Sequence, residues 1–376
     1  MFKIRWFVDL KFSKYFSLGL MNVGLAHIIY SQINLIKLGG HNWGTGEWLI
    51  NYGGGFIRRG LFGELLLNLP LSGEISLLIL VFLQFVLYFF IWVFLIKFLF
   101  LKNFHWSVIV LICSPAGILF VSWDTNVFIR KELLGLVCLI LLSISKVKYQ
   151  HNSHLLLLSW VFYTFALLSG EINFVFLPSV IYLLKDFNNQ NWLKLIIYRI
   201  LYVFSTLVAI IFTLFFHGNK ESPVVVCDKI TKNGFDPNSN CRGAVNVLDL
   251  NIQDTVSHLL TQFPNYFVYA PILLLTSLPL FLNSWILDNL RWLLIIFLGV
   301  SPLFFIGWDY GRWIFIIYMQ ITICLISSTT TFNRLNRLPP LVIVAYLTVY
   351  GFGHTGDPIN NGWIAAIPTT ILRITN

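Results

Sequence analysis

The sequence predicts an all-α polytopic transmembrane helical bundle. Of its 376 residues, 57% are hydrophobic and only 11% are charged, and its mean hydropathy is +0.78. A soluble domain carries roughly 25% charged residues, so this chain lacks the charge that a water-facing surface needs. Several apolar runs also approach the roughly 20 residues with which a helix crosses the hydrocarbon core of a bilayer. We therefore expect one integral membrane domain over residues 1–376.

Hydropathy along the chain predicts about eleven spans. They are expected at residues 16–36, 76–96, 107–123, 132–145, 155–169, 172–184, 195–216, 266–283, 292–307, 313–329 and 339–353. Gly170 separates the fifth span from the sixth, and a kink in one longer helix is the alternative at this point. The run after Lys11 and Lys14 has no small-residue cleavage site, so we expect no cleaved signal peptide.

Basic residues predict the orientation. Four of them precede the first span and place the N-terminus in the cytoplasm. When the spans alternate from there, every cytoplasmic loop contains Lys or Arg. These loop residues are Lys97, Lys102, Lys146, Lys148, Lys185, Lys194, Arg291, Arg334 and Arg337. The net charge of +9 is thus explained by topology, and we expect no nucleic-acid partner.

The same alternation leaves two long segments outside, residues 37–74 and a large loop at 217–265. The first contains three successive glycines followed by Arg58 and Arg59. Glycine permits positive φ and close approach of a ligand, and adjacent arginines offer bidentate donors to phosphate oxygens. This pattern predicts an anion-binding loop. The alternative is a re-entrant turn whose arginines bind lipid head groups.

Two short outer turns, at 124–131 and 308–312, contain further cations. Arg130 and Lys131 run against the tendency of basic residues to stay inside. They indicate an anionic substrate, or else a salt bridge between Arg130 and Asp124. Arg312 follows Asp309 by three residues, close enough to pair on a helical turn. Such a pair either locks two helices or orients a pyrophosphate-binding arginine.

Two outer residues, Glu171 and His217, are candidates for a functional role by their position and residue type. A carboxylate at membrane depth, as at Glu171, usually lines a site, although a water-exposed turn is the alternative there. Histidine is the side chain best suited to proton transfer near neutral pH, but a structural role is the alternative for His217.

The large outer loop contains two of the five cysteines, Cys227 and Cys241. An extracytoplasmic compartment is oxidising, so we predict a disulfide that closes a loop of roughly fourteen residues and contributes about 3 kcal/mol. The other three cysteines fall within spans and act as small apolar residues.

Several function classes are disfavoured. The sequence contains no CxxC or HExxH cluster, so no metal site is predicted, and no Walker loop, so ATP is not expected as a direct substrate. No cofactor is expected. Ion-coupled transporters place polar residues near the bilayer midplane, whereas this chain concentrates them at one interface. That distribution favours an enzyme whose lipid-linked substrate has its polar head at the outer leaflet.

The segments Tyr52-Gly-Gly-Gly-Phe-Ile-Arg-Arg-Gly-Leu61, Arg130-Lys-Glu132, Glu171 and Asp309-Tyr-Gly-Arg312 resemble membrane proteins of bacterial O-antigen and capsule clusters. The layout of the whole chain is similar to that of Wzy-type O-antigen polymerases. The resemblance implies a GT-C-like bundle in the bacterial inner membrane. It also implies transfer of a growing glycan from undecaprenyl pyrophosphate onto the next lipid-linked repeat unit, without a nucleotide sugar or a required metal.

In such an enzyme the pyrophosphate ligands would be Arg58, Arg59, Arg130, Lys131 and Arg312. The general base would be one of Glu47, Glu171, His217 and Asp309. Membrane lipids and a chain-length regulator protein are the partners that this resemblance suggests. Three other readings stay open: a glycosyltransferase that uses a polyprenyl-monophosphate sugar, with Glu47 as its acidic residue; a flippase for lipid-linked oligosaccharides; and a non-catalytic scaffold.

Overall fold

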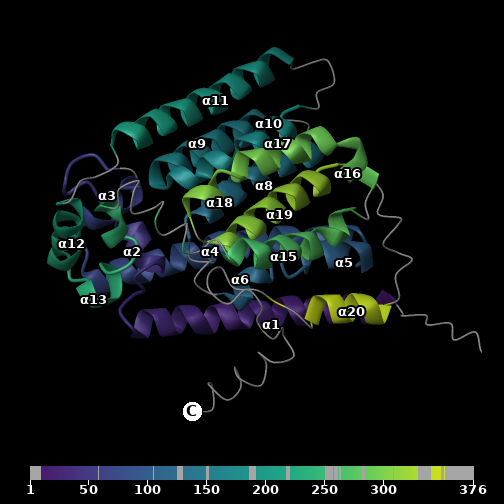
Figure 1. Ribbon diagram of the computed structural model, residues 1–376, viewed down its shortest axis with the longest axis horizontal. Helices are drawn as coiled ribbons and strands as arrows, with labels where there is room; N and C mark the ends of the chain where they lie inside the picture. Colours follow the sequence, from purple (N-terminus) through teal and green to yellow (C-terminus); the bar gives the residue numbers. More distant parts are fainter. Residues whose placement is uncertain are drawn as a thin grey trace, which may run out of the picture.

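The computed structural model describes residues 10–57, 59–104, 106–124, 130–149, 152–185, 192–216, 221–249, 257, 261, 264–281, 284–307, 309–328, 340–348 and 351. All regular elements within these ranges are helices, and these ranges contain no strand. The predicted all-α class is therefore confirmed. Figure 1 shows the long helices lying side by side in one bundle.

The helices follow the expected spans. In chain order the elements are α1 (Leu10–Lys37), α2 (Gly44–Leu49), α3 (Leu61–Leu67), α4 (Gly73–Leu101), α5 (Trp106–Ile112), α6 (Phe120–Trp123), α8 (Glu132–Tyr149), α9 (Ser153–Ser169), η1 (Glu171–Phe176), α10 (Leu177–Leu183), α11 (Trp192–Phe215), α12 (Ser222–Lys232), α13 (Pro237–Asn240), η2 (Asn246–Asp249), α15 (Pro264–Phe281), α16 (Ser284–Asp288), α17 (Leu290–Val300), α18 (Leu303–Ile306), α19 (Tyr310–Ile326) and α20 (Pro340–Thr348).

Two expected spans are interrupted, and a third break separates two neighbouring spans. Proline lacks the backbone N–H that an interior helical position needs, and Pro115 and Pro302 lie where the third and ninth expected spans break into two helices. Gly170 is in an extended conformation, with φ −165° and ψ 114°, and ends α9 before the 3-10 helix η1. The fifth and sixth expected spans are therefore separate helices and not one kinked helix.

Among the described residues, three helices are long and apolar enough to cross a membrane: Phe12–Lys37, Gly73–Leu101 and Trp192–Phe215. Five further apolar stretches are shorter, at Ser153–Ser169, Glu171–Leu183, Tyr269–Leu280, Leu290–Phe305 and Tyr310–Ile326. Together these apolar helices indicate a membrane protein.

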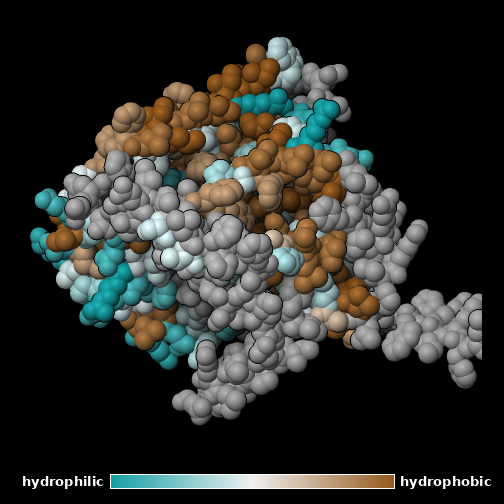
Figure 2. Space-filling model, in the orientation of Figure 1, coloured by the Kyte–Doolittle hydropathy of each residue, from teal (hydrophilic) through white to brown (hydrophobic). Residues whose placement is uncertain are grey.

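The outer surface of the bundle supports the same conclusion. Helix α11 lies at the edge of the bundle (Figure 1) and exposes large apolar side chains, among them Leu193, Ile200, Phe204 and Leu207. Figure 2 shows hydrophobic residues covering this edge, whereas hydrophilic residues gather at the end that contains α12 and α13. Contiguous apolar surface of this kind is unfavourable in water and suits contact with lipid.

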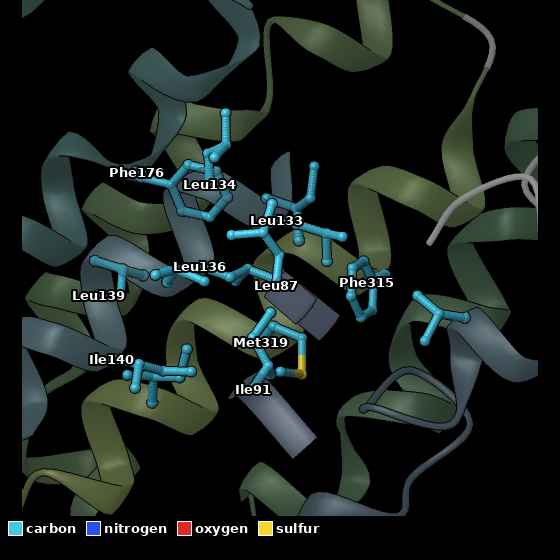
Figure 3. Packing of buried hydrophobic residues seen from close by; sticks show 14 of the residues in the cluster. Leu87, Ile91, Leu133, Leu134, Leu136, Leu139, Ile140, Phe176, Phe315 and Met319 are labelled. Atoms are coloured by element: carbon cyan, nitrogen blue, oxygen red, sulfur yellow. The ribbon is translucent and has the colours of Figure 1, made fainter. Parts of the chain in front are cut away.

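The core of the bundle is built around α8 and α19. All residues of α19 are buried, as are residues 132–143 of α8, so both helices are apolar on every side. Figure 3 shows the packing: Leu133, Leu136 and Ile140 of α8 lie among side chains of α4 and α19, with Phe176 of η1 close by. The first residue of α8 is Glu132, and Arg312 lies in the first turn of α19, so the packing of the core also fixes where these charges lie.

The two long outer segments of the sequence come together at one end of the bundle. They form an outer lobe, which consists of α2, α3, α12, α13 and η2. Asn240 joins them, because it accepts a hydrogen bond from Thr45 at 2.6 Å and donates one to the Gly39 carbonyl oxygen at 2.9 Å. The predicted disulfide between Cys227 and Cys241 is present and links α12 to the residue after α13.

Candidate functional site

Eight ionisable side chains meet where the outer lobe joins the bundle. This charged cluster consists of Glu47, Arg59, Arg130, Lys131, Glu132, Glu171, Asp309 and Arg312. It contains seven of the nine residues that the sequence suggested for catalysis or phosphate binding. The other two, Arg58 and His217, lie outside the described residues. The eighth member, Glu132, was recognised in the sequence only as part of a motif.

Arg130 pairs with Glu47. Its Nη1 donates to Glu47 Oε2 at 2.9 Å, and its guanidinium lies 5.4 Å from the centre of the Trp43 ring. Both charged side chains are about 6% exposed. Burial alone would raise the pKa of Glu47, but the positive charges of Arg130 and the other three cations lower it below its ordinary value. Glu47 is therefore a buried, ionised carboxylate.

Arg59 pairs with Glu171 across the junction of the first outer segment and η1. Arg59 Nε donates to both Glu171 oxygens, at 2.6 and 2.7 Å, and Nη2 also contacts Oε1. The backbone of Arg59 is left-handed, with φ +72°, a conformation that costs a non-glycine residue about 1–3 kcal/mol. Of the three preceding glycines, Gly55 has φ +100°, as the expected glycine turn requires.

Lys131 holds the backbone next to both members of this pair. Its Nζ donates to the carbonyl oxygens of Arg59, at 2.8 Å, and Ser169, at 2.6 Å. The side chain is fully buried, and burial lowers the pKa of Lys131 to about 7 although Glu47 and Glu171 act in the opposite direction. The sequence suggested Lys131 as a pyrophosphate ligand; in the structure its ammonium group instead connects the first outer segment to the end of α9.

Arg312 lies between two carboxylates. Its Nη2 is 3.0 Å from Asp309 Oδ2, which is the predicted pair, and its Nε is 3.4 Å from Glu132 Oε1. Its guanidinium also packs 4.4 Å from the centre of the Trp313 ring. The contact with Glu132 places the first turns of α8 and α19 beside each other. Each helix N-terminus carries a partial positive charge of about 0.5, so the site has an affinity for anions beyond that of its side chains.

Several buried N–H donors of the site make no hydrogen bond within the described ranges. They are Nε of Arg130, Nε and Nη1 of Arg312, and Nε1 of Trp313. Buried donors are normally paired, because an unpaired one costs about 1–3 kcal/mol. Donors of this type suit the oxygens of a phosphate or pyrophosphate. In the same ranges, no group of three or more His, Cys, Asp and Glu side chains is arranged to hold a metal ion.

An apolar groove leads from the edge of the bundle to the Arg59–Glu171 pair. It is shallow and partly open to the outside, and it is lined by Arg59, Glu171 and the apolar residues Phe56, Ile57, Leu167, Leu168, Ala209 and Phe212, with Thr213 beside them. Two of the apolar residues belong to α11, whose opposite face exposes large apolar side chains. The groove therefore combines an apolar lining with the Arg59–Glu171 ion pair.

A hydrogen-bonded network holds the glycine-containing segment against the outer lobe. Glu64 accepts hydrogen bonds from the Tyr52 backbone N–H at 2.8 Å and from Lys229 Nζ at 2.7 Å. Burial would raise the pKa of Glu64, but the bonds from Lys229 and Tyr52 lower it. Sequence analysis missed this link, because Lys229 is 165 residues away from Glu64 along the chain and no sequence pattern indicated that the two outer segments meet.

Comparison with known proteins finds no matching protein family, no matching curated protein and no matching solved structure.

Proposed function

We propose that this protein is a membrane glycosyltransferase of the O-antigen polymerase type. It transfers a glycan chain from undecaprenyl pyrophosphate onto a lipid-linked repeat unit. The anomeric carbon of the donor glycan is attacked by a sugar hydroxyl of the acceptor, the bond from that carbon to the pyrophosphate oxygen breaks, and the pyrophosphate leaves with the electron pair. The enzyme must therefore bind two anionic lipid heads at the membrane surface and remove one proton.

The observation that carries the proposal is the charged cluster, with its unpaired arginine donors, at the end of an apolar groove. Arg312 has donors available for pyrophosphate oxygens at the N-termini of α8 and α19. Preorganised donors and helix ends of this kind stabilise negative charge as it develops on a leaving group. The groove at Arg59 accepts the first part of a lipid chain. A site for a water-soluble phosphate compound would not need an apolar lining of this kind.

We further propose a GT-C-like arrangement of about eleven spans in the bacterial inner membrane, from hydropathy. The N-terminus is cytoplasmic and the outer lobe lies in the periplasm. The disulfide between Cys227 and Cys241 supports this orientation, because disulfides persist in the oxidising periplasm and are rare in the cytoplasm. A chain-length regulator would bind from the same side.

The first test is the surface glycan of the source strain after deletion of this gene. Loss of the long-chain ladder, with one repeat unit still attached to the lipid core, is the expected result. Plasmid-borne wild type should restore the ladder, and an Arg312→Ala variant should not.

Two other results would reject the proposal. Loss of all repeat units would point to an earlier glycosyltransferase or to a flippase. An unchanged ladder would point away from glycan assembly altogether. Equal membrane levels of the two complementing proteins are the control for insertion.

A further inference from the structure

Glu132 differs from the other carboxylates of the charged cluster. It is the first residue of α8 and its side chain is 4% exposed. Neither of its carboxylate oxygens accepts a hydrogen bond from another residue in the described part of the chain. The nearest cation, Arg312, approaches only to 3.4 Å through Nε, and this contact does not satisfy the geometry of a hydrogen bond.

The other three carboxylates are each bound more closely by an arginine. Glu47 accepts from Arg130 at 2.9 Å, and Glu171 is held by Arg59 Nε through both oxygens. Asp309 lies 3.0 Å from Arg312 Nη2. A carboxylate whose lone pairs are bound by a guanidinium is a poor proton acceptor, because the cation favours its ionised form. Glu132 is the member of the described cluster whose lone pairs are least engaged.

We propose that Glu132 is the proton acceptor of the reaction, an inference that rests on the proposed function. The hydroxyl oxygen of the acceptor sugar forms the new bond to the anomeric carbon, and its proton passes to a carboxylate oxygen of Glu132. The bond between the anomeric carbon and the pyrophosphate oxygen breaks, and the electron pair leaves with the pyrophosphate. The proton is released to water after the product departs, so no oxidant, reductant or further reactant is required.

The geometry also couples this step to substrate binding. The Asp309 side chain is 17% exposed, compared with 4% for Glu132, and Arg312 lies between them. An arriving pyrophosphate therefore meets Arg312 before it reaches Glu132. Once the guanidinium turns to the pyrophosphate, Glu132 loses its nearest cationic partner, and a carboxylate that is less stabilised by cations binds a proton more readily. Glu132 thus becomes an effective base when the donor substrate is in place.

The test uses purified protein reconstituted in vesicles, with the lipid-linked single repeat unit extracted from the deletion strain as substrate. Glu132→Gln should reduce kcat by at least about 100-fold, the usual contribution of a general base, with little change in KM. Sodium formate should restore part of the activity of Glu132→Ala, because a small carboxylate can take the vacated place. Glu47→Ala is the matched control: it also removes a buried glutamate of the cluster, and formate should not restore its activity.

The outcomes separate the two proposals. Wild-type protein that makes no polymer from this substrate would overturn the proposed function, and the role of Glu132 with it. An active wild type together with a Glu132→Gln variant that retains more than a tenth of its kcat would overturn the role of Glu132 alone, as would equal rescue of Glu47→Ala by formate. If Glu132→Gln does not reach the membrane, Glu132→Asp and Glu132→Asn decide: the aspartate alone should be active, and equal activity of the two would reject the inference.

Discussion

The connection made by Lys131 gives a prediction that can be worked out from the structure. Lys131→Met keeps the length and apolar stem of the side chain but removes the donor that serves the Arg59 and Ser169 carbonyl oxygens. A buried acceptor that loses its donor costs about 1–3 kcal/mol, so the loss of both costs about 2–6 kcal/mol. In a chain of this size each kcal/mol lowers Tm by roughly 2 °C. We therefore expect Tm to fall by about 4–12 °C at pH 9.

The pH dependence of this loss has a definite sign. Burial lowers the pKa of Lys131 to about 7, from 10.5 for an ordinary lysine. Between these two values the unfolded chain binds one more proton than the folded chain, so the stability of the wild type rises with pH, by up to about 1.4 kcal/mol per unit. Lys131→Met lacks this contribution. The gap in stability between wild type and variant should therefore widen from pH 7 to pH 9 and stay constant below pH 7.

The assay is thermal unfolding of the purified protein in detergent, followed by tryptophan fluorescence at several pH values. Lys102→Met is the matched control, because Lys102 is exposed at the end of α4 and its removal should change stability by less than about 0.5 kcal/mol. Equal Tm values for Lys131→Met and wild type, or a gap that is the same at pH 7 and pH 9, would refute the reasoning. Polymer formation should fall by about 100-fold in the same variant, since a displacement of roughly 1 Å in a catalytic group has an effect of this size.

Three further predictions concern the phosphate ligand, the disulfide and the outer lobe. Arg312→Ala should lower polymer formation by about 100- to 1000-fold, and Arg312→Lys should recover only a small part of it because lysine lacks the planar fork; full activity of the alanine variant would contradict this. Replacing Cys227 and Cys241 by serine should lower the stability of the outer lobe by about 3 kcal/mol and speed its proteolysis, and reductant should slow the wild type on gels; identical mobility with and without reductant would contradict the bridge. Gly46→Ala would place a Cβ 2.4 Å from a backbone carbonyl oxygen of α13, so it should destabilise the protein by about 1–3 kcal/mol, whereas Gly19→Ala, with nothing within 4 Å, should not.

The helical fold could be predicted from sequence because it depends on local properties. Hydropathy predicted the main helices of the described bundle close to their observed positions, and proline and glycine explain where the expected third, sixth and ninth spans begin or break. The number of membrane crossings depends on more than composition. Three helices are long enough by themselves, whereas short pairs such as α17 and α18 cross a bilayer only if they continue one another.

The members of the charged cluster were predictable, but most of their pairings were not. Charged residues are rare in this apolar chain, so seven of the eight members could be recognised in the outer loops of the sequence. The Asp309–Arg312 pair was predictable because it spans one helical turn. The pairs Arg59–Glu171 and Arg130–Glu47 join residues 112 and 83 positions apart, and only the packing of α8 against its neighbours brings them together. Glu132 had one signal in the sequence, an acidic residue at the start of an apolar run on the outer side.

The pairing pattern has a consequence for binding. The charged cluster contains four cations and four carboxylates, so it is close to neutral as a whole. A buried arginine with no partner would cost several kcal/mol, and the carboxylates avoid this cost when no substrate is bound. In the proposed function, an anionic head first meets the donors of Arg312 that make no hydrogen bond and then displaces a carboxylate from the guanidinium. The 3.4 Å contact between Arg312 and Glu132 is the weakest of these pairs, so displacement occurs there first. Under the proposed function we expect selectivity for pyrophosphate over a singly charged anion, because a ligand that offers several oxygens to the guanidinium replaces both the charge and the hydrogen bonds that the carboxylates supply.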